Sequence, residues 1–336
     1  MSDFKINSIA TKQGQHGPVI AGVSTVNSTG CMKIPSGPTE FRGGRGRGII
    51  GSGQLIPSGG VNTMNLITIA TTGNATDFGD LSVGAAYRKG LASSTRGIFS
   101  NSQGDLTFDY VTISSQGGGV DFGEAFTDHM GGATFNSSTR GFRAGGSDPS
   151  VSTPHTSNIM GMIIASTGSF FDAGDLTIVG TYQNGASSPT RGIIFGGATP
   201  SGAYNNIDAF TMASGGNATK FGELSAARQY VDTSSNTIRG LSAGGSPSTN
   251  LIEFVTIATE GNAQDFGDLH SATVTGKNGS VSSATRGIFS GFYPAQTARM
   301  DFVTIMSAGN AQDFGDMTAT WYYHGGCSDS NGGIDL

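Results

Sequence analysis

One segment of 16 to 18 residues recurs six times along this chain of 336 residues. Each copy joins an apolar run, a glycine-containing turn and a short signature that reads Asp-Phe-Gly-Asp in its clearest form. The copies are Leu66–Leu81, Tyr110–Ala125, Met160–Leu176, Ile207–Leu224, Ile252–Leu269 and Met300–Met317. The signature glycines are separated by 44 to 51 residues. A period of this length is typical of β-propellers and other repeat arrays.

A second motif follows the same period. An Arg-Gly pair precedes an apolar run in every repeat, with the arginines at Arg47, Arg96, Arg140, Arg191, Arg239 and Arg286. Each repeat therefore predicts four short strands: the run after Arg-Gly, the apolar run, the signature, and the segment after the signature, such as Ser225–Val231. Tyrosine recurs in this last segment of four repeats, at Tyr87, Tyr182, Tyr230 and Tyr323.

The composition supports an all-β fold. Glycine supplies 55 of the 336 residues, well above the usual share of ~7 %, and many short strands joined by tight turns need such residues. Charged residues make up 12 % of the chain and the net charge is −6. This balance argues against a nucleic-acid partner, which requires clustered lysine and arginine. No apolar run is long enough to span a membrane.

The two ends of the repeat region predict a closed ring. The first repeat lacks the tyrosine-containing strand, and the last repeat ends with one. We therefore expect a six-bladed β-propeller over residues 45–336, with a first blade built from Arg47–Leu81 plus about Thr318–Cys327. Closure of this kind removes the open sheet edges that promote aggregation.

Residues 1–44 do not fit the repeat. Two β-prone runs, Val19–Val26 and Cys31–Pro35, flank a polar turn and predict a β-hairpin. Because an isolated hairpin is barely stable in water, we expect this arm to dock on the repeat domain, on another copy of the chain or on a larger assembly.

The repeats resemble kelch repeats. This resemblance rests on the Arg-Gly strand that ends in a glycine pair and on the run LSAARQYVDTSSNTIRGLSAGG at 224–245. The tryptophan usual in kelch blades is absent. A second resemblance covers nearly the whole chain. The chain resembles repeat-rich structural proteins of tailed bacteriophages from aquatic environments, such as those that infect cyanobacteria. This resemblance rests on the repeated sequence GNAxDFGDL…SSTRGIF and on the arm sequence GQHGPVIAGVSTVNSTG.

This resemblance implies a virion component without enzymatic activity or cofactor, in the tail, baseplate or fibre. Its expected partners are other virion proteins bound through the arm, further copies of itself within the virion, and a host surface glycan or protein. Two alternatives stay open. One is a capsid-surface decoration protein without a receptor role, and the other is a glycan-cleaving enzyme.

The phenylalanine of the signature is expected to fill the space between blades, while its glycine makes a turn with positive φ. Ala173 replaces this phenylalanine in the third repeat, so that blade should pack differently. No metal site is expected from the scattered histidines.

The six arginines allow two interpretations. They could form a ring that binds an anion, or each could pair with an acidic residue of the signature, which planar guanidinium groups do well. We favour the structural pairs. The acidic residues are Asp80, Glu124, Asp175, Glu223, Asp268 and Asp316.

Two sets of turns differ in their regularity. The turns before Arg-Gly and before the signature repeat almost unchanged, whereas the loops after the glycine pair vary in length and sequence. In a propeller these sets lie on opposite faces, so we expect one uniform face and one variable face. Irregular loops on a rigid scaffold often carry recognition, and His155, Tyr204, Phe292 and Tyr293 are the candidate ligand-binding residues. The alternative is that these loops vary because nothing constrains them.

Overall fold

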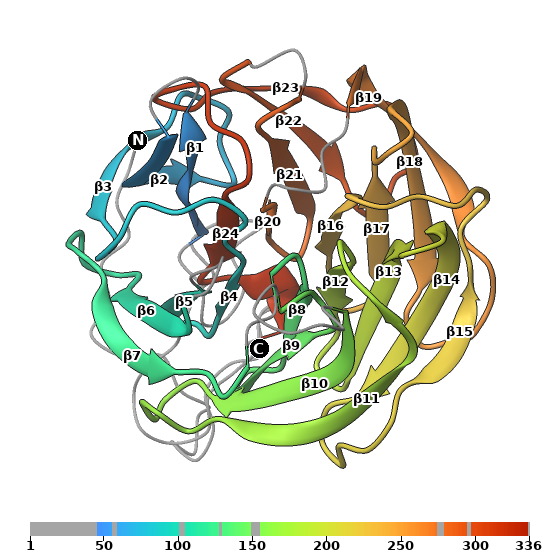
Figure 1. The fold of residues 1–336 in the computed structure, drawn as a ribbon. Coiled ribbons are helices and arrows are strands. Elements are labelled where there is room, and N and C mark those ends of the chain that lie inside the picture. Colours follow the sequence, from blue (N-terminus) through green and yellow to red (C-terminus); the bar gives the residue numbers. More distant parts are fainter. Residues whose placement is uncertain are drawn as a thin grey trace, which may run out of the picture.

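A computed structural model describes residues 46–55, 59–100, 105–127, 130–148, 155–273, 279–293 and 297–334. The predicted hairpin arm at 1–44 lies outside these residues. The described residues form six four-stranded antiparallel sheets arranged around a central axis as the blades of a β-propeller (Figure 1). The predicted fold class is therefore confirmed.

Each blade runs from an innermost strand at the axis to an outer strand at the rim. The innermost strands of blades 1 to 6 are β24 (Gly325–Ser328), β4 (Gly90–Ala92), β8 (Ala133–Asn136), β12 (Asn184–Ser187), β16 (Asp232–Ser235) and β20 (Val281–Ser282). The second strands are β1 (Arg47–Leu55), β5 (Arg96–Ser100), β9 (Arg140–Ala144), β13 (Arg191–Thr199), β17 (Arg239–Ala243) and β21 (Arg286–Ser290).

The third strands are β2 (Gly59–Thr68), β6 (Thr107–Thr112), β10 (Thr156–Ile163), β14 (Gly202–Thr211), β18 (Thr249–Thr256) and β22 (Arg299–Thr304). The outer strands are β3 (Thr76–Asp80), β7 (Val120–Glu124), β11 (Phe171–Gly180), β15 (Thr219–Glu223), β19 (Gln264–Thr273) and β23 (Gln312–Asp316).

The two ends of the described chain close the ring, as the sequence predicts. β24 pairs antiparallel with β1 in the first blade, with Cys327 opposite Ile49, and the two strands lie side by side in Figure 1. A short 3-10 helix, η1 (Asn331–Gly333), then ends the described chain close to the axis.

The position predicted for the innermost strands is wrong by several residues. The segment Ser225–Val231 is mostly an irregular crossing from the rim to the axis, and the strand begins after it, at Asp232. The closing strand likewise begins at Gly325, near the end of the expected range. Tyr230 and Tyr323 have φ angles of 59° and 63°. A strand cannot continue through this left-handed backbone, so it begins only beyond the tyrosine.

Buried side chains gather between the blades. The described core divides into six clusters, and each combines residues from two neighbouring blades. The signature phenylalanines join these clusters; Phe78 of blade 1, for example, packs with Phe99 and Ile113 of blade 2. In blade 3, where Ala173 stands in the signature, Phe171 packs against the cluster instead and meets Phe142 edge to face. Both expectations about this position are confirmed.

No helix in the described part of the chain is long and apolar enough to cross a membrane.

Candidate functional site

Strand direction assigns the turns to two faces. The turns between innermost and second strands and those between third and outer strands lie on one face, because neighbouring strands are antiparallel. The connections between second and third strands lie on the opposite face, with the crossings that lead to the next blade. We call these the uniform face and the variable face, and their separation matches the prediction.

The uniform face repeats one arginine contact around the whole ring. Each guanidinium donates a hydrogen bond to the backbone carbonyl just after the third strand of the next blade. The pairs are Arg47 with Ile113 (3.1 Å), Arg96 with Ile164 (3.1 Å), Arg140 with Met212 (3.3 Å), Arg191 with Ile257 (3.3 Å), Arg239 with Ile305 (3.1 Å) and Arg286 with Ile69 (3.1 Å).

The predicted partners of these arginines are therefore wrong. The ion pairs of the described residues include none between the arginines and Asp80, Glu124, Asp175, Glu223, Asp268 or Asp316. Strand register explains the failure. Arg47 lies opposite Thr68, whereas Asp80 lies opposite Thr63, five residues along β2, or roughly 17 Å.

The acidic residues instead join neighbouring blades at the rim through backbone hydrogen bonds. The N–H of Asp316 in blade 6 donates to the side-chain oxygen of Asn74 in blade 1 (3.1 Å), and the carbonyl of Asp316 accepts from the N–H of Ala75 (2.8 Å). The same clasp joins Asp175 to Asn217, Glu223 to Asn262 and Asp268 to Asn310. Their carboxylates are exposed or half-buried at the rim.

The structure does not gather the four predicted ligand-binding residues into one site. Phe292 is 2 % exposed and belongs to the core between blades 5 and 6. The hydroxyl of Tyr204 accepts a hydrogen bond from Gln183 (2.9 Å), so this side chain supports the β13–β14 hairpin. His155 is half-buried beside Ser147. Tyr293 alone joins a larger aromatic group, through a contact with Tyr322 (5.5 Å between ring centroids).

That aromatic group lies on the variable face around the axis. Tyr323 stacks on Tyr87, with centroids 4.4 Å apart and planes 16° apart, and Tyr182 packs on Tyr230 at 4.2 Å. Tyr322 meets Tyr323 edge to face at 4.4 Å. Burial raises the pKa of Tyr87, Tyr230 and Tyr323, so their hydroxyls stay protonated at neutral pH.

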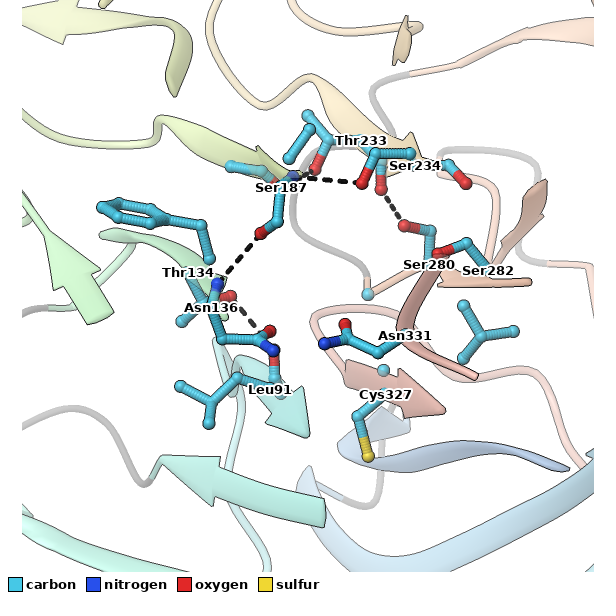
Figure 2. Close-up of a pocket in the computed structure, with 18 of the residues that line it drawn as sticks. Leu91, Thr134, Asn136, Ser187, Thr233, Ser234, Ser280, Ser282, Cys327 and Asn331 are labelled. Carbon is cyan, nitrogen blue, oxygen red and sulfur yellow. Dashed lines mark hydrogen bonds between the residues drawn. The ribbon is translucent and has the colours of Figure 1, made fainter. Parts of the chain in front are cut away.

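A polar channel lies on the axis between the innermost strands (Figure 2). Hydroxyl and amide side chains of the innermost strands line it and bridge neighbouring blades. Ser187 accepts from the N–H of Asn136 (2.9 Å) and Ser235 accepts from the N–H of Ser187 (3.0 Å). Asn331 closes the uniform-face side by donating to the carbonyl of Ala92 (3.2 Å). The remaining cavity of about 70 Å³ exceeds what one water needs.

A lysine and an aspartate interact electrostatically at the variable-face end of the channel. Lys89 immediately precedes β4 of blade 2, and Asp232 begins β16 of blade 5; both are buried. Burial lowers the pKa of Lys89 and raises the pKa of Asp232, and the attraction between the two groups opposes both shifts. One oxygen of Asp232 accepts from the N–H of Thr233 (2.9 Å), while its Oδ2 has no hydrogen-bond partner in the described structure.

Sequence analysis missed this site, although one signal pointed to it. The tyrosines recur at one place in four repeats, but their spacing alone does not say that they meet. Only closure of the ring brings Tyr87 against Tyr323. Lys89 and Asp232 carry no repeat signal, because each occurs in one blade only.

The described residues contain no group of three histidine, cysteine, aspartate or glutamate side chains that could hold a metal ion. Comparison with family models and with curated proteins finds no match for this chain.

Proposed function

We propose that this protein is a structural component of a tailed bacteriophage particle that binds through the variable face of its propeller. Residues 1–44 attach it to the virion, in the tail, baseplate or fibre, and the variable face contacts the host surface or a neighbouring subunit. The attachment and the virion location rest on the sequence resemblance to phage structural proteins.

The observation that carries the binding role is the difference between the two faces. The uniform face uses its arginines for contacts between blades, and those contacts recur with little change. The variable face presents hairpins of unequal length and a cluster of tyrosines. The β13–β14 hairpin, for example, extends to a turn at Pro200 and Ser201, with Thr199 opposite Gly202. A rigid scaffold that repeats one face and varies the other is suited to recognition on the varied face.

The test is binding of the full-length protein to cells of candidate hosts. In one variant, the hairpin segment 198–203 of the variable face is replaced by a Gly-Ser linker of equal length. The matched control carries Thr72→Lys and Glu260→Lys, two exposed positions on the uniform face. We expect saturable binding that falls about tenfold or more in the first variant and stays unchanged in the control.

Absence of binding to a host that the phage infects would overturn the receptor role. The remaining candidate would then be a capsid-surface decoration protein. Equal loss of binding in both variants would place the contact outside the variable face.

A further inference from the structure

The backbone at the four axial tyrosines is strained. Tyr87, Tyr182, Tyr230 and Tyr323 have φ angles of 59° to 63°, a region that bulky side chains rarely adopt. Blade 3 has a glycine at the same register, Gly131, with φ of 70°. Glycine thus meets the conformational requirement of this turn without strain, whereas tyrosine adds a cost of about 1 kcal/mol or more in each blade.

The strained tyrosines are arranged as two pairs around the axis. One pair joins blades 1 and 2 (Tyr323 and Tyr87), and the other joins blades 4 and 5 (Tyr182 and Tyr230). Gly131 lies between the pairs, and a side chain there would collide with the ring of Tyr182, because its Cβ would lie 2.7 Å from that ring. Tyr87 and Tyr323 act electrostatically on the hydroxyl of Tyr230, so the two pairs are neighbours.

One buried polar atom without a hydrogen-bond partner in the described structure lies near the tyrosine pairs. It is the Oδ2 atom of Asp232, two residues after Tyr230, and Asp232 is fully buried. Buried polar atoms are normally satisfied, so a hydroxyl group of a ligand or of water would complete this one.

We propose that the two tyrosine pairs form a carbohydrate-binding site on the propeller axis, which takes a neutral sugar at the end of a surface glycan. A pyranose ring offers an apolar face of C–H groups for packing on the tyrosine rings, and tyrosine provides rigid contact area with a polar edge. A sugar hydroxyl would supply a hydrogen-bond partner for Oδ2 of Asp232 at the channel mouth. This site would be the glycan-binding part of the variable face, so the assignment rests on the proposed function.

The variant Tyr182→Gly/Tyr230→Gly removes one pair and should retain the fold, because Gly131 shows that glycine suits this register. The control is Tyr110→Leu, a half-buried residue of β6 that lies beneath Arg96 near the uniform face. The probes are the methyl glycosides of glucose, galactose, mannose, rhamnose and N-acetylglucosamine, studied with the full-length protein by saturation-transfer NMR.

We expect at least one glycoside to receive saturation from tyrosine protons, with an affinity that falls about tenfold or more in the double variant. The control should bind as the unchanged protein does. Binding of none of the glycosides, or equal binding by the double variant, overturns the axial sugar site.

The host-cell experiment separates this proposal from the proposed function. Cells that bind the unchanged protein and the double variant equally would leave the recognition role standing and remove the axial site. Glycoside binding without cell binding would support the axial site and overturn the host-receptor role.

Discussion

The arginines of the Arg-Gly motif stabilise the ring by holding backbone rather than carboxylates. The carbonyl of Ile257 follows the third strand of blade 5, and Arg191 of blade 4 reaches it at 3.3 Å. A charged donor to a backbone acceptor needs no particular side chain in the neighbouring blade. This explains how the contact recurs around a ring whose blades differ in sequence.

Arg191→Ala should lower the free energy of unfolding by about 1–2 kcal/mol, because the carbonyl of Ile257 loses a charged donor. In a double-mutant cycle with Glu223→Gln, the coupling energy should stay below about 0.5 kcal/mol, since the two side chains do not meet. Urea denaturation measures both quantities. A coupling energy above about 1 kcal/mol would show that Arg191 and Glu223 form the ion pair that the structure excludes.

His324 should make the fold sensitive to acid. It is fully buried, and burial lowers its pKa to about 3 from 6.5 in the unfolded chain. Between pH 3 and pH 6.5 the unfolded state therefore binds a proton on this histidine that the folded state does not bind. The contribution of neutral His324 to the free energy of unfolding is fully present above pH 6.5. It is lost as the pH falls toward 3, at about 1.4 kcal/mol per pH unit.

His324→Gln should remove this dependence, and Gln183 shows that glutamine fits the same register in blade 4. Midpoints of urea unfolding at pH 4.5 and pH 7.5 measure the effect, with an expected difference of about 2–3 kcal/mol between the two proteins. Equal pH dependence in both would show that His324 is not the group responsible.

At the scale of elements, buried acceptors in the third strands fix the start of the crossings. Asp109, Asp208, Glu253 and Asp301 are at most 4 % exposed. Each accepts a hydrogen bond from the backbone N–H of the second residue after the preceding blade's signature, at 2.9 to 3.1 Å. The pattern was present in the apolar runs, as the acid in IEFVT and MDFVT. Its partner could not be found from the sequence, because it lies in another blade.

The backbone contact of Asp316 in blade 6 with Asn74 and Ala75 in blade 1 depends on a nearby glycine. Gly315 has φ of 137°, and a Cβ there would lie 2.4 Å from the carbonyl oxygen of Gly73. Gly315→Ala should cost about 3 kcal/mol or more, because backbone strain adds to a collision with backbone. Gly309→Ala is the control, with φ of 152° and open space around it, and should cost about 1 kcal/mol. Thermal unfolding of the two variants checks the order, and a similar loss in both would contradict the clasp.

At the scale of the whole molecule, closure by β24 should control the reactivity of Cys327. This free thiol is 6 % exposed and packs beside Gly97 of blade 2. Burial also raises its pKa, which reduces the reactive thiolate. In a Cys31→Ser background, a thiol reagent should modify Cys327 at least about a thousandfold more slowly in the folded protein than in urea.

Asp329→Ala should accelerate this labelling, because Asp329 accepts from the N–H of Arg47 (2.9 Å) beside the closing strand. Fast labelling of the unchanged folded protein would mean that the ring opens readily. An unchanged rate in Asp329→Ala would show that this hydrogen bond does not hold β24 in place.

The all-β class, the six blades and closure by the C-terminal strand could be predicted without a structure. Each follows from the repeat period and from which strand the first and last repeats lack. The uniform and the variable face could also be told apart from the sequence, because the direction of successive antiparallel strands alternates along each repeat. Tertiary structure sets the partners of Arg47 and its five equivalents, the pairing of Tyr87 with Tyr323, and the electrostatic interaction of Lys89 with Asp232. These interactions join different blades, and register and ring closure set their geometry.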